Sequence, residues 1–479
     1  MALGYWRLIS RCSLEVMQTQ TDFGLSLRPL QLLSGCLTLH TLAQLKAGEL
    51  SRVSRLRIAE NLTEFPVEIF DLADSLEILD LSNNRLSCLP LDFGRLYRLK
   101  ILFLSNNNFE QIPKVLLDCA NLDTIGFKAN RIVSIPEAAF PASTRWLILT
   151  DNQIETLPDS IGELGQLQKL MLAGNRLTAL PATLAKCTNL QLLRISANLL
   201  ACLPDWLMHM PNLAWLAFAG NPFSHFSDNE NAGVPKVTLA DIQLHEMLGE
   251  GASGVIYRAT WINPPLSLQG SSEQLAVKLF KGHVTSDGYP VDELQASLAA
   301  GNHPNLVRMT AQLAENDQLG LIMALIPDTF YNLGLPPSMA TCTRDTFEDG
   351  FQLPLADIAR IALSIADTLV HLHQQGLCHG DLYAHNILVD LDATVLLGDF
   401  GATSSFSSLP GLQREALQTL EVRAYGHLLD DLLGLCGDRA SGLKLFEQLS
   451  VLKTSYTQVH INSGLTFSDI KGQLKALIV

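Results

Sequence analysis

Four short stretches in the second half of the chain hold side chains that could do chemistry together. HGDLYAHNIL carries Asp381 and, five positions later, Asn386, and LLGDFGATSS carries Asp399. LAVKLF sets Lys278 in a short apolar run, and LGEGASGV holds three closely spaced glycines. Carboxylate and amide oxygens are ligands for Mg²⁺, and glycines let backbone amides approach phosphate oxygens. The four stretches therefore indicate a site for a phosphate-bearing ligand and a metal ion.

These residues need strands and helices to hold them, and the neighbouring patterns predict such elements. LAVKLF and LGLIMALIPD predict short buried strands. VDELQASLAAGNHPNLV predicts a helix that carries Glu293 and ends near Gly301. PLADIARIALSIADTLVHLHQQG has apolar residues at helical spacing and predicts a long buried helix. The glycine motif alone is weak because dinucleotide sites share it, but no acidic residue ends a second strand at the spacing those sites require.

The first half of the chain repeats itself. Asparagines recur every 22 or 23 residues, each preceded by apolar residues at fixed offsets and usually followed by a leucine–proline step. They are Asn61, Asn84, Asn107, Asn130, Asn152, Asn175, Asn198 and Asn221. This is the pattern of the leucine-rich repeat, in which short strands stack into a horseshoe and each asparagine bonds the backbone where the chain turns. We expect eight turns between about residues 50 and 224.

In their order, the elements of the second half resemble the protein-kinase superfamily, and the whole chain resembles leucine-rich-repeat kinases of bacteria and plants. The resemblance implies that Lys278, held in place by Glu293, would neutralise phosphates of ATP. Asp399 and Asn386 would bind Mg²⁺. Asp381 would orient an acceptor hydroxyl and take its proton, so Asp381, Lys278 and Asn386 are the expected catalytic residues.

The resemblance also implies which residues contact ATP. They lie in the glycine-rich segment, the lysine strand, the following helix, the strand that enters the hinge, and the strand after the catalytic loop. They are Gly249, Glu250, Gly251, Gly254, Ile256, Ala276, Lys278, Glu293, Met323, Leu325 and Leu388. Met323 would stand at the gatekeeper position.

Two features depart from the kinase pattern. Gly380 and Tyr383 stand where the catalytic loop usually carries an arginine and a lysine. The segment from Ala402 to Leu420 is short and is followed, without an A-P-E motif, by EVRAYGHLLDDLL, which resembles a buried helix of kinases. Because the usual arginine binds a phosphorylated activation loop, we expect activity without that phosphorylation. Substituting all five hydroxyl residues of the segment should change turnover by less than about threefold.

Outward residues of the repeat strands line the concave face of the horseshoe. Apolar and aromatic side chains gather there toward the middle and C-terminal turns, namely Trp146, Ile148, Met171, Leu192 and Trp215. Such a patch suits a protein or peptide partner. The alternative is a face partly covered by the chain's own second domain. We expect a protein partner or substrate on this face.

Composition limits the remaining classes of function. The formal net charge of −15 argues against a nucleic-acid partner, because phosphate backbones attract basic surfaces. No run approaches 18 uninterrupted apolar residues, so no membrane span is expected. The cysteines form no C-x-x-C pair, and Cys119 and Cys187 share one repeat position, as buried thiols do in a reducing cytoplasm. We therefore expect a cytoplasmic protein.

The sequence thus predicts a multidomain α/β chain. We expect a leader or flexible N-terminus over 1–37, a repeat solenoid over 38–224, a linker over 225–237, and a bilobal kinase-like α+β domain with a trimmed C-lobe over 238–479. The sequence favours the function of an ATP- and Mg²⁺-dependent protein Ser/Thr kinase whose repeats recruit a protein partner or substrate. HGDL also occurs in small-molecule kinases of the same fold, and a non-enzymatic ATP-binding scaffold is a third hypothesis.

Overall fold

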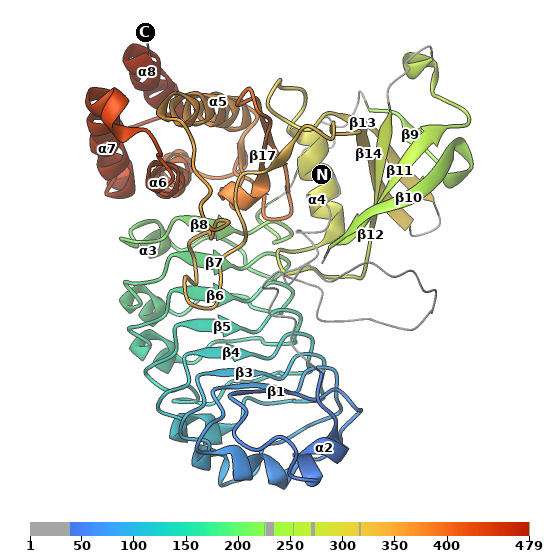
Figure 1. The fold of residues 1–479 in the computed structure, drawn as a ribbon, viewed down its shortest axis with the longest axis vertical. Helices are drawn as coiled ribbons and strands as arrows, with labels where there is room; N and C mark the ends of the chain where they lie inside the picture. The colour runs from blue at the N-terminus through green and yellow to red at the C-terminus, as the bar shows by residue number, and fades with distance from the viewer. Residues whose placement is uncertain are drawn as a thin grey trace.

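The computed structural model describes residues 39–224, 226, 234–251, 253–269, 274–315 and 318–478. Figure 1 shows a stack of repeats with a two-lobed domain seated on its last turns. The expected leader over 1–37 lies outside the described residues, as does most of the expected linker. The first described helix is the short α2 (Leu42–Lys46), which Thr41 caps at its N-terminus.

The repeats form one eight-stranded parallel sheet whose strands follow one another in chain order. Each strand is three residues long, and its middle leucine or isoleucine is buried in the core of the stack. The strands are β1 (Arg55–Arg57), β2 (Ile78–Asp80), β3 (Ile101–Phe103), β4 (Thr124–Gly126), β5 (Trp146–Ile148), β6 (Lys169–Met171), β7 (Leu192–Arg194) and β8 (Trp215–Ala217). The predicted solenoid is confirmed.

The asparagine ladder fastens each repeat to the one before it. The amide nitrogen of Asn84 donates to the carbonyls of Ile58 and Leu81 at 2.8 and 2.9 Å, and its oxygen accepts from the backbone of Leu62 at 2.9 Å. The asparagines from Asn84 to Asn221 are buried in this way. Asn61 differs, since it is exposed with φ +56° at the first turn, where no earlier repeat strand is described.

The side of the stack opposite the sheet consists of short helical turns. Prolines precede most of them, because proline has a fixed φ and no N–H to leave unpaired at the start of a turn. The turns are η1 (Val67–Leu72), η2 (Phe93–Arg95), η3 (Lys114–Asp118), η4 (Asp159–Glu163), η5 (Ala182–Lys186) and α3 (Asp205–Met208).

The smaller lobe of the second domain is a six-stranded sheet in the order β10-β11-β12-β14-β13-β9. Its elements are β9 (Lys236–Val237), η7 (Leu239–Asp241), β10 (Ile242–Glu250), β11 (Gly254–Trp261), η8 (Leu266–Leu268), β12 (Leu275–Phe280), β13 (Met309–Glu315) and β14 (Gln318–Ala324). The helix α4 (Pro290–Ala299) packs Leu294 and Leu298 against one face of this sheet. β9 joins the sheet although it falls within the expected linker.

The larger lobe is mainly helical. Its helices are α5 (Leu355–Gln374), η9 (Ala384–Asn386), α6 (Gly411–Gly434), η10 (Arg439–Gly442), α7 (Leu443–Thr457), η11 (Ile461–Ser463) and α8 (Phe467–Ile478). Its short strands are β15 (Tyr331–Asn332), β16 (Leu377–Cys378), β17 (Ile387–Val389), β18 (Val395–Leu397) and β19 (Ser404–Ser405). The predicted long buried helix is α5, whose apolar face lies in the core of this lobe.

One expectation about this lobe was wrong. The helix around EVRAYGHLLDDLL is α6, but it begins at Gly411, ten residues before Glu421. GLQREALQTL is rich in good helix formers and continues the helix toward its N-terminus. The segment between Gly401 and α6 is therefore Ala402–Pro410 and does not extend to Leu420.

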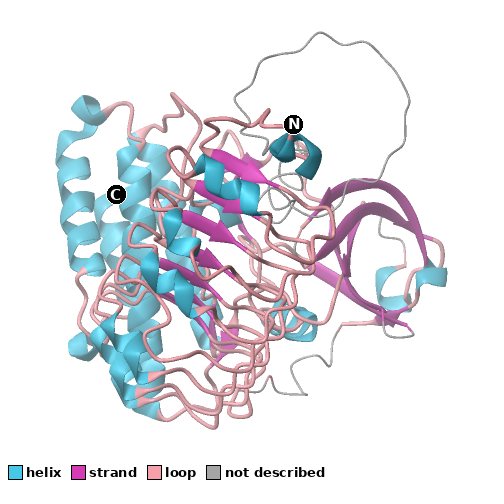
Figure 2. Cartoon of the chain, turned by 90° about the horizontal axis from the view of Figure 1, so that it is seen from below, coloured by secondary structure: helices cyan, strands magenta, loops and turns pink. Residues whose placement is uncertain are grey.

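The repeats and the larger lobe share their hydrophobic cores. Phe406, Leu409 and Leu417 of the lobe belong to the same buried cluster as the repeat leucines. Leu192 and Trp215 of the repeats belong to the cluster built around α5 and α6. Viewed from below, the stack lies in front of the two lobes, with the helices of the larger lobe to one side and the strands of the smaller lobe to the other (Figure 2). The two parts therefore pack as one body.

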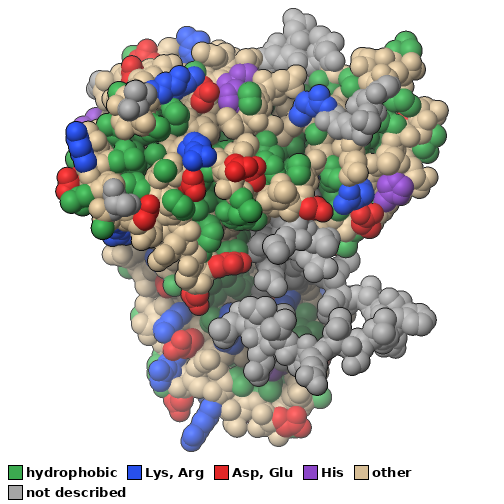
Figure 3. All heavy atoms as spheres, turned by 45° about the horizontal axis from the view of Figure 1, so that its top comes forward, with side chains coloured by type: hydrophobic (Ala, Val, Ile, Leu, Met, Phe, Trp, Pro, Cys, Tyr) green, Lys and Arg blue, Asp and Glu red, His purple; other side chains and the backbone are tan. Residues whose placement is uncertain are grey.

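The face of the two lobes seen in Figure 3 carries side chains of several kinds. In Figure 3, acidic and basic side chains lie scattered among apolar and uncharged ones. In the described part of the chain, no helix combines the length and apolarity needed to cross a membrane. The described cysteines are all free, and Cys119 and Cys187 are buried in the repeat core as expected.

Candidate active site

A buried ion pair joins the sheet and the helix of the smaller lobe. The ammonium of Lys278, on β12, donates a hydrogen bond to Glu293 in the first turn of α4. Pro290 starts this helix, because its fixed φ suits a first turn. Burial raises the pKa of Glu293, and the attraction of Lys278 opposes that rise. The pair fixes the lysine head where the sheet faces the cleft between the lobes.

A pocket lies beside this pair. Eight of the residues expected to bind nucleotide or metal line it, namely Glu250, Gly251, Gly254, Ile256, Lys278, Glu293, Met323 and Asp399. The remaining lining residues are Ser253, Ser297, Val307, Met309, Leu321, Gly398 and Phe400. Gly254 is needed for close packing, because a β-carbon there would stand 2.4 Å from the carbonyl oxygen of Leu279.

Three of the expected contacts do not line the pocket but pack with residues that do. Ala276 and Leu388 are fully buried and pack in the same apolar cluster as Ile256 and Met323, and Leu325 packs against that cluster. Gly249 lies in β10, paired with Ile256 of β11, and is not among the lining residues. The structure therefore brings most of the expected nucleotide residues together around one cleft.

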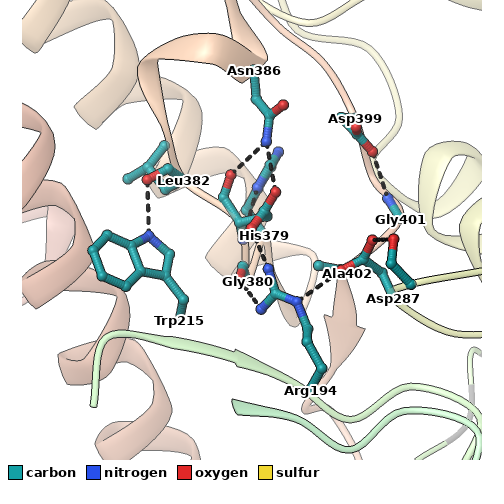
Figure 4. A network of polar contacts seen from close by, with 12 residues as sticks. Arg194, Trp215, Asp287, His379, Gly380, Leu382, Asn386, Asp399, Gly401 and Ala402 are labelled. Atoms are coloured by element: carbon teal, nitrogen blue, oxygen red, sulfur yellow. Dashed lines mark hydrogen bonds and ion pairs between the residues drawn. The ribbon is translucent and has the colours of Figure 1, made fainter. Parts of the chain in front are cut away.

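The catalytic-loop residues form a hydrogen-bonded unit (Figure 4). The amide nitrogen of Asn386 donates to the Asp381 carbonyl at 2.9 Å and to Asp381 Oδ2 at 2.8 Å. The His379 ring bonds the carbonyl of Gly398 at 3.0 Å, which ties the loop to the segment that carries Asp399. From beneath, Glu421 on α6 accepts the backbone N–H of Gly380 at 3.0 Å.

Asp399 and Asn386 offer oxygens that suit Mg²⁺. Asp399 adopts a left-handed φ of +57°, and its Oδ1 accepts the backbone N–H of Gly401 at 3.2 Å. The amide nitrogen of Asn386 faces Asp381, so its amide oxygen points away from that residue (Figure 4). A carboxylate and an amide oxygen are hard donors of the kind Mg²⁺ prefers. The donor chemistry therefore fits a nucleotide-bound magnesium ion.

A residue from the repeats forms hydrogen bonds with the catalytic loop. The guanidinium of Arg194, at the end of β7, donates to Asp381 Oδ1, to the Gly380 carbonyl at 2.9 Å, and to Asp287 Oδ1 at 2.8 Å. Burial alone would raise the pKa of Asp381, but Arg194 and then His385 outweigh it and hold that pKa below its ordinary value. Asp381 is therefore ionised at neutral pH, as a proton acceptor must be.

The chain matches known families in both halves. Residues 242–422 match the family described as protein tyrosine and serine/threonine kinase. Residues 120–177 and 165–223 match one leucine-rich-repeat family model, and residues 75–96 match another. This chain joins leucine-rich repeats to a protein-kinase domain. The resemblance predicted from the motifs is confirmed.

Curated relatives match parts of the chain. An L-type lectin-domain containing receptor kinase of Arabidopsis thaliana is 31% identical, covering 33% of this chain and 22% of the relative. The serine/threonine-protein kinase fray1 of Dictyostelium discoideum is 28% identical, covering 34% and 26%. A mouse leucine-rich repeat and calponin homology domain-containing protein is 31% identical, covering 23% and 16%. In each case the chain spans well under two thirds of the relative's length.

The kinase domain covers part of the surface where we expected a partner. Trp215 is 1% exposed and Leu192 is 2% exposed, and both pack into the core of the larger lobe. The indole N–H of Trp215 donates to the Leu382 carbonyl at 3.1 Å, and its ring stacks on Tyr383 at 4.6 Å. These two residues are therefore not a free docking surface, and the own-domain alternative holds for them. Trp146, Ile148 and Met171 are half-buried.

Sequence reasoning missed Arg194 and Asp287 as parts of the site. Arg194 was visible only as one outward residue of a concave face whose neighbouring positions are mostly apolar. The signal that could have identified Arg194 is a charged outward residue near the last repeat in a chain whose catalytic loop lacks its own arginine. Asp287 lies in the loop before α4 and carries no motif, so nothing in the sequence distinguished it.

Proposed function

We propose that the chain transfers the terminal phosphoryl group of ATP, with Mg²⁺, to serine or threonine hydroxyls of proteins. The observation that carries the proposal is a pocket lined by the Lys278–Glu293 pair and Asp399. The hydrogen-bonded Asp381–Asn386 loop is tied through His379 to Gly398, the pocket residue before Asp399. An ordinary surface would not bury a lysine–glutamate pair beside a metal-type carboxylate and a hydrogen-bonded aspartate.

Each residue has a role in this proposal. Lys278 attracts the nucleotide's phosphates, and Glu293 keeps the ammonium in one position. Asp399 and Asn386 would hold the metal ion, which would supply positive charge beside the phosphates. Asp381 orients the acceptor hydroxyl through a carboxylate oxygen and takes its proton. The glycine-rich turn between β10 and β11 leaves room for backbone amides to approach phosphates.

A protein acceptor is favoured over a small molecule by the repeats themselves, since leucine-rich repeats supply an extended surface for protein recognition. We propose that a partner contacts Trp146 and Ile148, the half-exposed members of the concave patch that do not pack against the core of the larger lobe, whereas Met171 does pack against it. The free cysteines among the described residues support a cytoplasmic location.

The test is phosphoryl transfer from γ-labelled ATP by the purified chain, alone and in a cell lysate. Asp381→Asn should lower turnover by roughly 10²–10⁴-fold with little change in nucleotide affinity, because Asp381 contacts the acceptor. The asparagine keeps the shape of a side chain whose partner, Arg194, is buried. Turnover equal to that of the parent would contradict the catalytic role.

Asp399→Asn is the companion variant. A neutral amide replaces a metal-binding carboxylate, so calorimetry should detect weaker binding of ATP in the presence of Mg²⁺. Unchanged affinity together with unchanged turnover would favour the scaffold hypothesis. Labelling of soluble metabolites, with no protein labelled, would favour a small-molecule kinase.

A further inference from the structure

Arg194 is an unusual residue for its place in the repeats. Its side chain is 2% exposed and lies at the interface between β7 and the kinase domain. Moving a guanidinium from water into a protein interior is costly unless its donors and its charge are both satisfied. Here every partner comes from the kinase domain, since Asp287, Gly380 and Asp381 together accept from Nε, Nη1 and Nη2.

The contacts of Arg194 hold both the backbone and a side chain of the catalytic loop. Nη1 donates to the backbone carbonyl of Gly380, and Nη2 donates to the side chain of Asp381. Asn386 donates to the other carboxylate oxygen of Asp381. With one hydrogen bond at each oxygen, the carboxylate cannot rotate freely. Each oxygen still has a lone pair for an incoming hydroxyl.

The guanidinium is itself held in place. Nε donates to Asp287 Oδ1 at 2.8 Å, and Oδ2 of the same carboxylate accepts from Ser286 at 2.8 Å. The loop of Asp287 precedes α4, the helix that carries Glu293. Arg194 therefore bridges the loop before α4 and the catalytic loop, which belong to different lobes.

We propose that Arg194 is a positioning residue for phosphoryl transfer, so that a leucine-rich-repeat strand supplies the cation that orients Asp381. The proposal rests on the proposed function, because it assigns a role within the same reaction. Sequence positions 380 and 383 in the loop hold glycine and tyrosine, neither of which supplies a cation. The repeats are in this view a working part of the active centre as well as a recruiting surface.

The test compares Arg194→Gln and Arg194→Lys with a matched control. Arg57 occupies the same register of β1, at the far end of the stack, and pairs with Asp80 at 3.2 Å. Arg194→Gln should lower kcat roughly 10²-fold, the scale of a misplaced reacting group, with KM for ATP changed less than about twofold. Arg194→Lys should recover about tenfold of that loss because an ammonium can still reach Asp381. Arg57→Gln should leave both constants unchanged.

Several outcomes would overturn the inference. An unchanged kcat in Arg194→Gln would make the contact purely structural, and a raised kcat would make it inhibitory. A parallel rise in KM for ATP would point to general disruption of the cleft. If Arg194→Gln does not fold, Asp287→Asn replaces it as the test variant, because it removes the second negative charge that pairs with the guanidinium. Asp287→Asn should lower kcat about fivefold to tenfold. An unchanged kcat in Asp287→Asn would also overturn the inference.

Failure of the proposed function gives a different result. A wild-type chain that transfers no phosphoryl group to any acceptor would overturn the proposed function itself. An active wild type with a fully active Arg194→Gln variant would overturn only the role of Arg194. The two failures are therefore distinguished by the parent protein's own turnover.

Discussion

The backbone of Gly380 lies directly against the carbonyl oxygen of Leu216 in the last repeat strand. A β-carbon at Gly380 would stand 2.9 Å from that oxygen and 2.7 Å from the carbonyl oxygen of Ala402. The φ of Gly380 is +73°, a conformation that side-chain-bearing residues rarely adopt. An arginine at this position could not coexist with β8 in its observed place. The close docking of β8 against the catalytic loop therefore requires glycine, and not arginine, at position 380.

Gly380→Ala should destabilise the chain by more than about 2 kcal/mol. Left-handed backbone costs an alanine roughly 1 kcal/mol, and crowding against two carbonyl oxygens adds to it. The control is Gly350→Ala, because Gly350 has a φ of +78° but nothing within 4 Å of an added β-carbon. Urea denaturation measures both variants. An equal loss in the two would show that β8 does not press on the loop.

Trp215→Ala should cost about 3–5 kcal/mol of unfolding free energy, as is usual for truncating a buried aromatic residue. Trp215→Phe should cost less, since it keeps an aromatic ring against Tyr383 and loses the hydrogen bond to Leu382. Trp146 holds the equivalent register in β5 but is half-buried. Trp146→Ala should therefore cost clearly less than Trp215→Ala, and a reversed order would argue against the shared core.

The hydroxyl residues after Gly401 differ in burial, so we expect them to respond differently to substitution. Ser404 is buried, and its Oγ accepts the backbone N–H groups of Phe218 at 2.9 Å and Ala219 at 3.1 Å. Ser404→Ala leaves two buried donors unpaired and should cost roughly 1–3 kcal/mol for each. Ser407 is exposed, so Ser407→Ala should change turnover less than about threefold.

Denaturation and turnover assays on the two serine variants check this prediction. Equal stability of Ser404→Ala and the parent would contradict the hydrogen bonds from the last repeat. A large loss of turnover in Ser407→Ala, restored by Ser407→Asp, would reveal a phosphate switch on this segment. A switch at Thr403, Ser404 or Ser405 would first require the segment to become accessible, because all three residues are buried.

We expect the free energy of unfolding to depend on pH through His427. Burial, with Arg344 adding to it, lowers the pKa of His427 to about 4, and its ring stacks on Trp215 at 5.2 Å. A histidine with a lowered folded pKa stabilises the fold above its unfolded pKa, near 6.5. It loses that contribution as the pH falls toward 4. Between pH 7 and pH 5 the loss should be about 2 kcal/mol.

The effect is isolated by comparing the parent with His427→Asn at both pH values. Asp431, whose pKa burial raises to about 6, titrates in the same range with the opposite sign. It is present in both proteins, so the difference between them reports His427. The exposed His209, changed to Asn, is the control. A difference between parent and His427→Asn that does not vary with pH would contradict the prediction.

Local sequence patterns predicted the main elements of both domains. The repeat period predicted the parallel strands, and the apolar spacing of α5 predicted a buried helix, because both depend on periodicity along the chain. The family resemblance also identified Lys278 and Glu293, which the structure brings together. The start of α6 was misplaced because the motif resemblance begins at Glu421, whereas the helix extends ten residues further toward Gly411 and its first five residues are mostly exposed.

The contacts between the domains were not predictable in the same way. Arg194 and Asp381 lie 187 positions apart, and their pairing depends on how the last repeats dock against the larger lobe. No periodic pattern encodes such docking, since it arises from shape and from buried residues such as Trp215 that look like ordinary concave-face residues. The expected free patch was wrong at Leu192 and Trp215 for the same reason.

Because the last repeats dock against the kinase domain, the two ends of the solenoid differ in how well they tolerate the gain or loss of whole repeats during evolution. Arg145, just before β5, also donates to the carbonyls of Met339 and Ala340 in the kinase domain. A duplication among the repeats before β4 would lengthen the stack away from the kinase domain and leave both Arg145 and Arg194 in place. An extra repeat inserted between β7 and the kinase domain would move Arg194 by about one strand spacing, roughly 4.8 Å, and put another side chain at the loop. Repeat number can therefore vary freely only toward the N-terminal end.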